Sequence, residues 1–294
     1  MLTKINLKNC WHWRRLENTR LRVTVMTFSS FTSFEFEGWE KSVEGYDSLF
    51  GDLTKQPVDR VLELANVEKG ADLLDLASGP GYLASRAHQI GARVIATDFS
   101  PEMIAKGEAK FPDIRFEIAD AQNLSQFDRS FDVVTMNFGI LHLEHPEVAI
   151  QQACSVLRAS GVFVFTTWER PEVSKGFEIA LEAIARHGSK ELEIPLGPDF
   201  FLFSNRDHAV HAGLEAGFKE VTCYTFDSTW DLSEPAEVFD AFISGTARTG
   251  GLLRAQPEEN LAQIKFAMHE MSKKYVKDGR VRIPMRVLIY VGKK

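Results

Sequence analysis

Short apolar runs alternate with stretches of helical period between residues 71 and 168, and this rhythm constrains the fold more than any other feature. The runs that predict strands are 71–77, 92–98, 114–120, 131–139 and 161–168. The stretches between them predict helices, and Ser100 followed by Pro101 is a typical helix start. Strands that alternate with helices of this length form a parallel sheet covered on both faces, so we expect a doubly wound α/β fold.

Small and polar residues stand where several of these strands end. The residues in question are Gly79, Asp98, Asp120 and Asn137. Parallel sheets bind their ligands outside the carboxyl ends of the strands, at the point where the strand order reverses. We therefore expect the binding site at this edge of the sheet.

The first strand leads into a glycine loop, Asp75-Leu76-Ala77-Ser78-Gly79-Pro80-Gly81. The loop also fits the loose pattern of dinucleotide-binding loops, with Asp98 near the place of a ribose-binding acid. However, the Asp75 carboxylate would repel a pyrophosphate, whereas it would suit a cationic ligand, directly or through water. S-adenosylmethionine carries a sulfonium and an ammonium, so the loop favours this cofactor. A nicotinamide-dependent dehydrogenase remains the alternative.

Taken together, these segments resemble the class I S-adenosylmethionine-dependent methyltransferases, in particular the small-molecule branch with the ubiquinone and menaquinone biosynthesis enzymes. The resembling segments are GWEKSVEGYDSLFGDLT (38–54), DLASGPG (75–81), ATDFS (96–100), ADAQNLSQFDRSFDVV (119–134), NFGILHL (137–143) and VLRASGVFVFTTW (156–168). The resemblance implies a mostly parallel seven-stranded sheet with an antiparallel last strand and helical lid insertions. It also implies S-adenosylmethionine-dependent methyl transfer to a small molecule.

The resemblance assigns roles to residues at the strand ends. The backbone of Ala77 and Gly79 would hold the methionine ammonium, and Asp98 would bind both ribose hydroxyls through charge-assisted hydrogen bonds. Asp120 and Ala121 would read the edge of the adenine. Asp98 could instead only cap the following helix, and Asp120 could be a turn residue.

Aromatic and apolar side chains would complete the cofactor site. Phe99 and Met103 would pack on the adenine, and Tyr46 and Trp39 would cover the methionine end, although all four could be ordinary packing residues. The full set of expected cofactor-binding residues is Trp39, Tyr46, Asp75, Ala77, Ser78, Gly79, Gly81, Asp98, Phe99, Met103, Asp120, Ala121 and Asn137.

His142 is the candidate catalytic residue. Methyl transfer mainly requires alignment and exclusion of water, but an acidic acceptor benefits from a general base. His142 follows Asn137 at the mouth of the sheet, although it could be a loop histidine bonded to backbone. His142 and His145 have no further ligands at a convincing spacing, so we expect no metal.

The segments outside the strand–helix rhythm predict a lid. They are residues 26–50, 171–205 and 233–279, and they are rich in phenylalanine. An apolar or aromatic acceptor follows, with O- or C-methylation favoured, unless these rings form only the lid's own core. Arg248 and Arg254 could meet a substrate anion or be solvated.

Residues 1–25 differ from the rest, because they hold six Lys or Arg and one acid. Such a start is typical of an organelle transit peptide, but we expect a disordered or non-native extension, since Met26 could be the true start. Residues 26–294 are predicted as a single domain with a cofactor-binding core at about 67–170. A chain that begins at Met26 is expected to fold and bind cofactor.

Composition narrows the function classes further. The net charge of −7 argues against a nucleic-acid binder, and no apolar run approaches the roughly 20 residues of a membrane span. The three cysteines form no CxxC pair, which favours a reducing compartment. We expect a cytoplasmic protein, with organelle targeting by residues 1–25 as the alternative. A non-catalytic S-adenosylmethionine-binding regulator also fits the sequence, and turnover would distinguish it.

Overall fold

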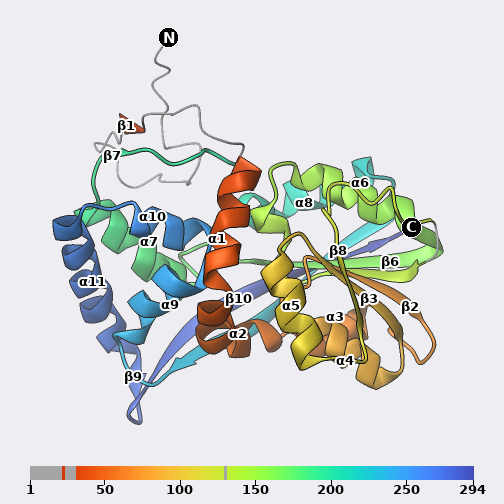
Figure 1. Cartoon of the computed structure of the whole chain (residues 1–294), viewed down its shortest axis with the longest axis horizontal. Helices are drawn as coiled ribbons and strands as arrows, with labels where there is room; N and C mark the ends of the chain where they lie inside the picture. The colour runs from red at the N-terminus through yellow and green to blue at the C-terminus, as the bar shows by residue number, and fades with distance from the viewer. Residues whose placement is uncertain (1–21, 24–30, 129–130) are drawn as a thin grey trace. The chain divides into compact units, whose positions relative to one another are not determined.

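The computed structural model describes residues 22–23, 31–128 and 131–294 (Figure 1). The extension 1–25 lies outside these residues, except for β1 (Arg22–Val23), which pairs in parallel with β7 (Glu191–Leu192). By its internal contacts the chain divides into two compact units, and each is described by itself. Within the described ranges, unit 1 comprises residues 22–23, 31–53, 170–200 and 229–285, and unit 2 comprises 54–128, 131–169, 201–228 and 286–294. The segments of unit 1 overlap those predicted as a lid, and their closing over a site stays a prediction.

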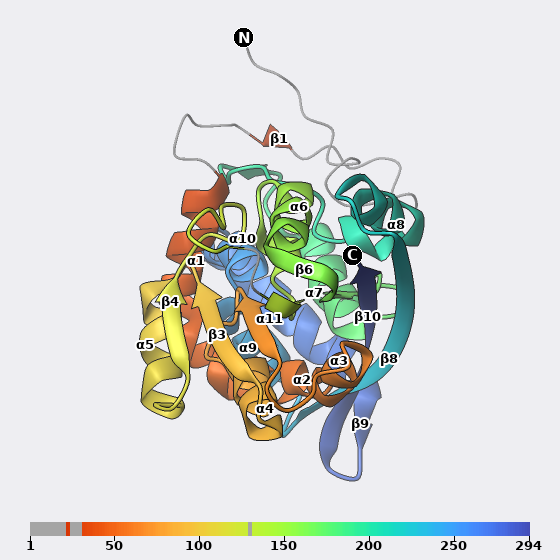
Figure 2. The same ribbon diagram turned by 90° about the vertical axis from the view of Figure 1, so that its right-hand side faces the viewer.

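The large sheet has the predicted architecture. Its strands are β2 (Asp72–Leu76), β3 (Arg93–Asp98), β4 (Arg115–Ile118), β5 (Phe131–Met136), β6 (Leu157–Trp168), β8 (Glu220–Leu232) and β10 (Arg280–Lys293). Their order across the sheet is β4-β3-β2-β5-β6-β10-β8, and Figure 2 shows β4, β3 and β2 side by side. The strands from β4 to β6 pair in parallel. The last strand, β10, runs antiparallel to β6, with Leu288 opposite Thr167.

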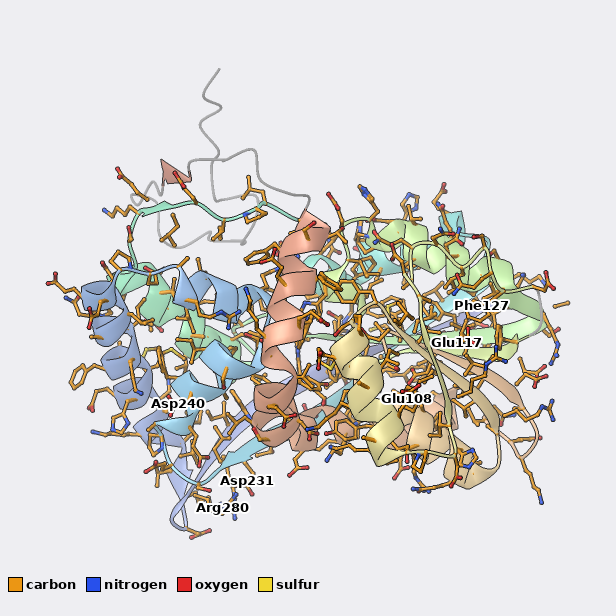
Figure 3. All side chains as sticks on the ribbon, in the orientation of Figure 1. Glu108, Glu117, Phe127, Asp231, Asp240 and Arg280 are labelled. Carbon is orange, nitrogen blue, oxygen red and sulfur yellow. The ribbon has the colours of Figure 1, made fainter. Side chains whose placement is uncertain are left out.

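The sheet contains one strand that the sequence did not predict. The short strand β9 (Val276–Lys277) pairs antiparallel with the start of β10. An ion pair between Arg280 Nε and Asp231 Oδ1, at 2.6 Å, links β10 to β8 (Figure 3). The doubly wound sheet with an antiparallel last strand is thus confirmed.

Five helices flank the strands of unit 2, and they are α3 (Val58–Leu64), α4 (Tyr82–Ile90), α5 (Pro101–Lys110), α6 (Pro146–Val156) and α8 (Arg206–Glu215). Figure 1 shows α6 and α8 above the sheet and α3 and α4 below it. The predicted start of α5 is confirmed, because Ser100 Oγ accepts a hydrogen bond from Met103 N at 3.1 Å. Gly91, with a φ of 101°, follows the last residue of α4 and caps this helix.

One predicted boundary is wrong. The pattern predicted a helix that continues to residue 160 and a strand that begins at Gly161, but α6 ends at Val156 and β6 begins at Leu157. Leu157 pairs with Phe131 across the sheet, and the register shifts before Val133 pairs with Val162. Sheet pairing therefore outweighs the helical propensity of this segment.

An ionic cluster joins the four strands β3, β2, β5 and β6 at one end of the sheet. Arg158 lies 2.6 Å from an oxygen of Asp132 and 2.7 Å from an oxygen of Asp72, which also pairs with Arg93 at 2.6 Å. The hydrogen bond from Arg93 and the contacts with Arg158 hold the pKa of Asp72 below its usual value. Burial alone would raise the pKa of Asp132, but its contacts with Arg158 lower it overall.

Unit 1 is mostly helical. It holds α1 (Phe31–Gly45), the π-helix η2 (Tyr46–Phe50), most of α2 (Gly51–Lys55), α7 (Lys175–His187), α9 (Glu237–Gly245), α10 (Arg248–Arg254), α11 (Glu258–Ser272) and η5 (Lys273–Tyr275). Buried aromatic rings form its core: Phe242 lies 5.6 Å from Phe50, 5.5 Å from Phe177 and 5.5 Å from Trp230 between ring centroids. The three phenylalanines belong to the segments predicted as a lid, so rings of these segments pack on one another and on Trp230.

Candidate cofactor-binding site

The loop after β2 has an unusual backbone. Ala77, Gly79 and Gly81 all have positive φ angles, of 48°, 53° and 81°. A Cβ at Gly81 would lie 2.6 Å from the ring of Phe116, so only glycine fits there. Ala77 is a non-glycine residue in the left-handed region, and such strain is typical of functional sites. The loop is also tied to β3, because Ser78 N donates to Thr97 O at 2.8 Å.

Asp98 lies at the carboxyl end of β3 and is 6% exposed. Its Oδ2 accepts a hydrogen bond from Gly79 N at 2.8 Å, and its Oδ1 accepts one from Ser100 N at 3.0 Å. The carboxylate therefore orders the glycine loop and the start of α5. A carboxylate can accept about four hydrogen bonds. The two oxygens of Asp98 could therefore accept hydrogen bonds from ribose hydroxyls in addition to these two contacts.

Asp75 is the most deeply buried acid of the loop, with 1% of its surface exposed. Thr135 Oγ1 on β5 donates to its Oδ1 at 2.7 Å, and its Oδ2 has no well-formed hydrogen bond to the described part of the chain. Burial raises the pKa of Asp75 to about 7, although the contacts with Thr135 and the Ala84 amide act in the opposite direction. Contact with a cationic ligand stays a prediction for this residue.

The residues predicted around the adenine lie on the loops that follow β3 and β4 and in the first turn of α5. Asp120 is exposed, and its Oδ1 accepts hydrogen bonds from the backbone and side-chain nitrogens of Gln122 at 2.8 and 3.2 Å. Ala121 and Met103 are buried, and Phe99 is half-buried. Their places at the ends of β3 and β4 fit the predicted roles, which stay predictions.

The backbone after β5 forms a second strained turn. Phe138 has a φ of 59°, and its ring stacks on Trp168 with centroids 4.1 Å apart. A Cβ at Gly139 would lie 2.6 Å from the Cβ of Ala77, so this turn touches the glycine loop. The ends of β2 and β5 are thus in direct contact, and each carries a left-handed non-glycine residue. We call residues 137–139 the β5 turn.

Three side-chain and backbone contacts hold the β5 turn. Asn137 Nδ2 donates to Thr54 O at 3.0 Å, and Asn137 Oδ1 accepts from Thr166 Oγ1 at 2.8 Å. Thr166 Oγ1 in turn accepts from Phe138 N at 2.8 Å. The side chain of Asn137 is therefore engaged within the protein, and a cofactor would meet the backbone of the turn. Thr166 could not be identified from the sequence, since no local signal predicts which residue of β6 faces β5.

His142 lies at the end of the short helix η3 (Ile140–His142), directly after the β5 turn. It is half-buried, and its amide donates to Gly139 O at 3.0 Å. His142 therefore comes directly after the β5 turn in the sequence. Its role as a general base stays a prediction. His145 stands at the start of α6 but makes no side-chain cap. Within the described ranges, no group of three or more His, Cys, Asp or Glu is placed to hold a metal.

Trp39 and Tyr46 belong to unit 1. Trp39 lies on α1 and Tyr46 begins η2, and their rings meet edge to face with centroids 5.6 Å apart. Their role as a cover for the methionine end stays a prediction.

Arg248 was predicted either to meet a substrate anion or to be solvated, and the structure shows that it is not solvated. Its side chain is 11% exposed, and its Nε lies 3.0 Å from an oxygen of the fully buried Glu35. The guanidinium also lies over the rings of Phe31 and Phe200, 4.5 and 5.5 Å from their centroids. Glu35 neutralises this charge, so the pairing favours a structural role over binding of a substrate anion. Arg254 donates to backbone oxygens near the end of α9.

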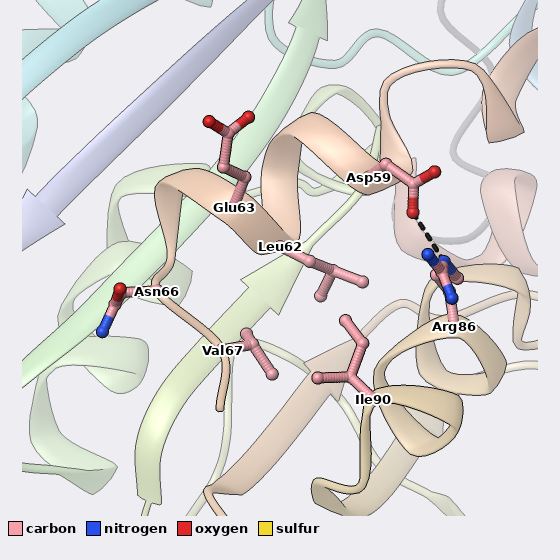
Figure 4. A pocket seen from close by; sticks show the side chains of 7 residues that line it. All are labelled: Asp59, Leu62, Glu63, Asn66, Val67, Arg86 and Ile90. Atoms are coloured by element: carbon pink, nitrogen blue, oxygen red, sulfur yellow. Dashed lines mark hydrogen bonds and ion pairs between the residues drawn. The ribbon is translucent and has the colours of Figure 1, made fainter. Parts of the chain in front are cut away.

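A surface pocket lies between α3 and α4 (Figure 4). It is lined by Asp59, Leu62, Glu63, Asn66, Val67, Arg86 and Ile90. Residues 66 and 67 lead into the amino end of β2, whereas the loop of Ala77 leaves its carboxyl end. This pocket is therefore separate from the candidate site. In the described ranges, the helices are all too short or too polar to cross a membrane.

Comparisons with known proteins agree with this geometry. A family profile described as a methyltransferase domain matches residues 73–161. The demethylmenaquinone methyltransferase of Paenarthrobacter aurescens is 28% identical over 171 residues, which cover 55% of this chain and 68% of the relative. The ubiquinone/menaquinone biosynthesis C-methyltransferase UbiE of Stutzerimonas stutzeri is 31% identical over 144 residues, or 44% of this chain and 56% of the relative. The chain spans about half the length of several other curated relatives.

A solved structure gives the fold a direct counterpart. Phosphoethanolamine N-methyltransferase 2 of Haemonchus contortus, in complex with phosphomonomethylethanolamine and S-adenosylhomocysteine, superimposes with a TM-score of 0.55. It is 15% identical, and the match covers 90% of this chain and 60% of the other. The profile, the relatives and the fold agree with the glycine loop and its acids. The chain therefore carries a methyltransferase domain over residues 73–161, and it resembles the quinone-biosynthesis methyltransferases in sequence and a methyltransferase in fold.

Proposed function

We propose that the protein methylates a carbon or oxygen atom of a small, apolar or aromatic metabolite. The observation that carries the proposal is the contact between the glycine loop and the β5 turn, where Ala77 and Phe138 both adopt left-handed backbone. Strain at two adjoining strand ends is typical of a site that holds a ligand in one geometry. The names of the relatives support a quinone-like aromatic acceptor as the first class to test.

The residues of unit 2 have separate tasks in the proposed reaction. S-adenosylmethionine, when bound, supplies an activated methyl group. Asp98 accepts hydrogen bonds from the ribose hydroxyls of the cofactor. The backbone of the glycine loop and of the β5 turn holds the methionine end of the cofactor. These contacts align the methyl group with the acceptor, which is the main requirement of an in-line displacement.

His142 completes the proposed reaction as a general base. It takes the proton that an acidic acceptor loses when its oxygen or carbon bonds to the methyl group. Histidine is the side chain that most often acts as a general base in proteins.

Binding measurements test the cofactor part of this proposal. We expect isothermal titration to show binding of S-adenosylhomocysteine and far weaker binding of NAD. The reason is that Asp75, Asp98 and Asp120 suit the ammonium of S-adenosylhomocysteine better than the pyrophosphate of NAD. Tight NAD binding without binding of S-adenosylhomocysteine would overturn the proposal.

A labelled methyl donor tests the acceptor. The protein is incubated with S-adenosylmethionine that carries a trideuterated methyl group, together with reduced 1,4-naphthoquinone, catechol or a metabolite extract. Mass spectrometry should detect a product heavier by one trideuteromethyl group, and heat-denatured protein is the control. Cofactor binding without any labelled product would instead favour a non-catalytic regulator.

A further inference from the structure

The hydroxyl group of Thr166 joins both halves of the β5 turn. It donates to Asn137 Oδ1 and accepts from Phe138 N, each at 2.8 Å, and the residue is completely buried. We propose that Thr166 is a positioning residue for methyl transfer, which holds the β5 turn in the conformation that meets the cofactor. This inference rests on the proposed function, because it assigns a task to a residue behind that site.

The β5 turn needs such a support because its conformation is unfavourable by itself. A phenylalanine with a φ of 59° lies in a region that L-residues rarely occupy. The amide of Phe138 is buried and takes the Thr166 oxygen as its acceptor, so without that oxygen the strained conformation would also lose a hydrogen bond. The stacking of Phe138 on Trp168 fixes the ring, whereas Thr166 fixes the backbone.

The same contacts reach the glycine loop. Because Gly139 approaches Ala77 so closely that a Cβ would lie 2.6 Å away, a shift of the β5 turn would displace the loop. Asn137 extends the support further, since its Nδ2 donates to Thr54 O at 3.0 Å. Loss of the Thr166 hydroxyl should therefore disturb two backbone segments that we assign to the cofactor.

The next residue of β6 provides a matched control. Thr167 is also completely buried, but its Oγ1 has no hydrogen-bond partner in the part of the chain that is described. Adjacent residues of a strand face opposite sides of the sheet, so Thr167 cannot support the β5 turn in the same way. Replacing either threonine by valine removes one buried hydroxyl at nearly constant volume, but only Thr166→Val removes hydrogen bonds.

The experiment compares four proteins: the wild type, Thr166→Val, Thr166→Ser and Thr167→Val. The affinity for S-adenosylhomocysteine is measured by titration calorimetry, and the melting temperature is measured in parallel. For an acceptor found in the labelling assay, kcat and the KM for S-adenosylmethionine are added. We expect Thr166→Val to weaken S-adenosylhomocysteine binding roughly tenfold or more and to lower kcat. Serine should restore both, and Thr167→Val should match the wild type.

Two results would overturn the proposal. The first is a Thr166→Val protein with a lower melting temperature but an unchanged Kd and kcat, which would make the residue purely structural. The second is an equal loss of affinity in Thr167→Val. If Thr166→Val does not fold, Asn137→Ala replaces it, because it removes the other end of the Thr166 contact, and an unchanged Kd there would also contradict the proposal. A wild type that fails to bind S-adenosylhomocysteine would instead contradict the proposed function.

Discussion

Replacing Asp75 by asparagine should change how the stability of the protein depends on pH. The carboxyl group is 1% exposed and receives one hydrogen bond, from Thr135, at 2.7 Å. Burial raises its pKa to about 7 from an ordinary value of 3.8. Asparagine has nearly the same shape and keeps an oxygen for Thr135, but it cannot ionise.

The sign follows from the two pKa values. Because the pKa is higher in the folded state, the folded protein holds this proton more tightly than the unfolded chain does. The contribution of Asp75 to the free energy of unfolding is therefore most favourable below about pH 4, and it is lost as the pH rises to about 7 and above. Between pH 5 and pH 8 the loss amounts to about 2–3 kcal/mol.

Urea unfolding followed by circular dichroism measures this effect, with both proteins studied at pH 5 and at pH 8 without ligand. The other titrating groups are common to both proteins, so they cancel in the comparison. We expect Asp75→Asn to gain about 2–3 kcal/mol relative to the wild type between the two pH values. If the difference between the two proteins is the same at both pH values, Asp75 ionises normally and the argument from burial is refuted.

Three further substitutions test the candidate site and the sheet. Asp98→Ala should weaken S-adenosylhomocysteine binding by about 2–4 kcal/mol in a calorimetric titration. An unchanged Kd in a folded variant would show that Asp98 binds only backbone amides and not the cofactor. His142→Ala should lower the rate of methyl transfer by about 10²–10⁴ with nearly intact cofactor affinity, whereas wild-type turnover would exclude the base. Arg158→Met should lower the urea midpoint at pH 7 and change it little near about pH 2. The reason is that Asp72 and Asp132 have lowered pKa values, so their ion pairs exist above those values and are lost as the pH falls; a loss of equal size at both pH values would contradict this.

The sequence was sufficient for the parts of the fold that depend on local chemistry. Buried strands read as continuous apolar runs, and Ser100 and Gly91 mark helix ends through their own capping preferences. The boundary between α6 and β6 was not predictable in this way, because Leu157 belongs to the strand through its pairing with Phe131. Only the folded sheet brings those two residues together.

The same distinction applies to the site. The glycine loop and its acids could be recognised because glycine and aspartate at a strand end are local signals. The hydrogen bonds that Thr135 makes to Asp75 and Thr166 makes to the β5 turn join residues on different strands. Which threonine faces which neighbour depends on the register between strands, and a single sequence does not display it.

The place of β10 in the sheet has a consequence for folding. It lies between β6 and β8, although β8 precedes it in the chain. During synthesis β8 therefore emerges before its neighbour in the sheet exists, and α9, α10, α11 and η5 are made between the two strands. Contacts between distant parts of a chain form slowly, and an unpaired strand edge invites pairing with other chains. A chain in which β10 has not yet been made therefore lacks the strand that covers the facing edges of β6 and β8.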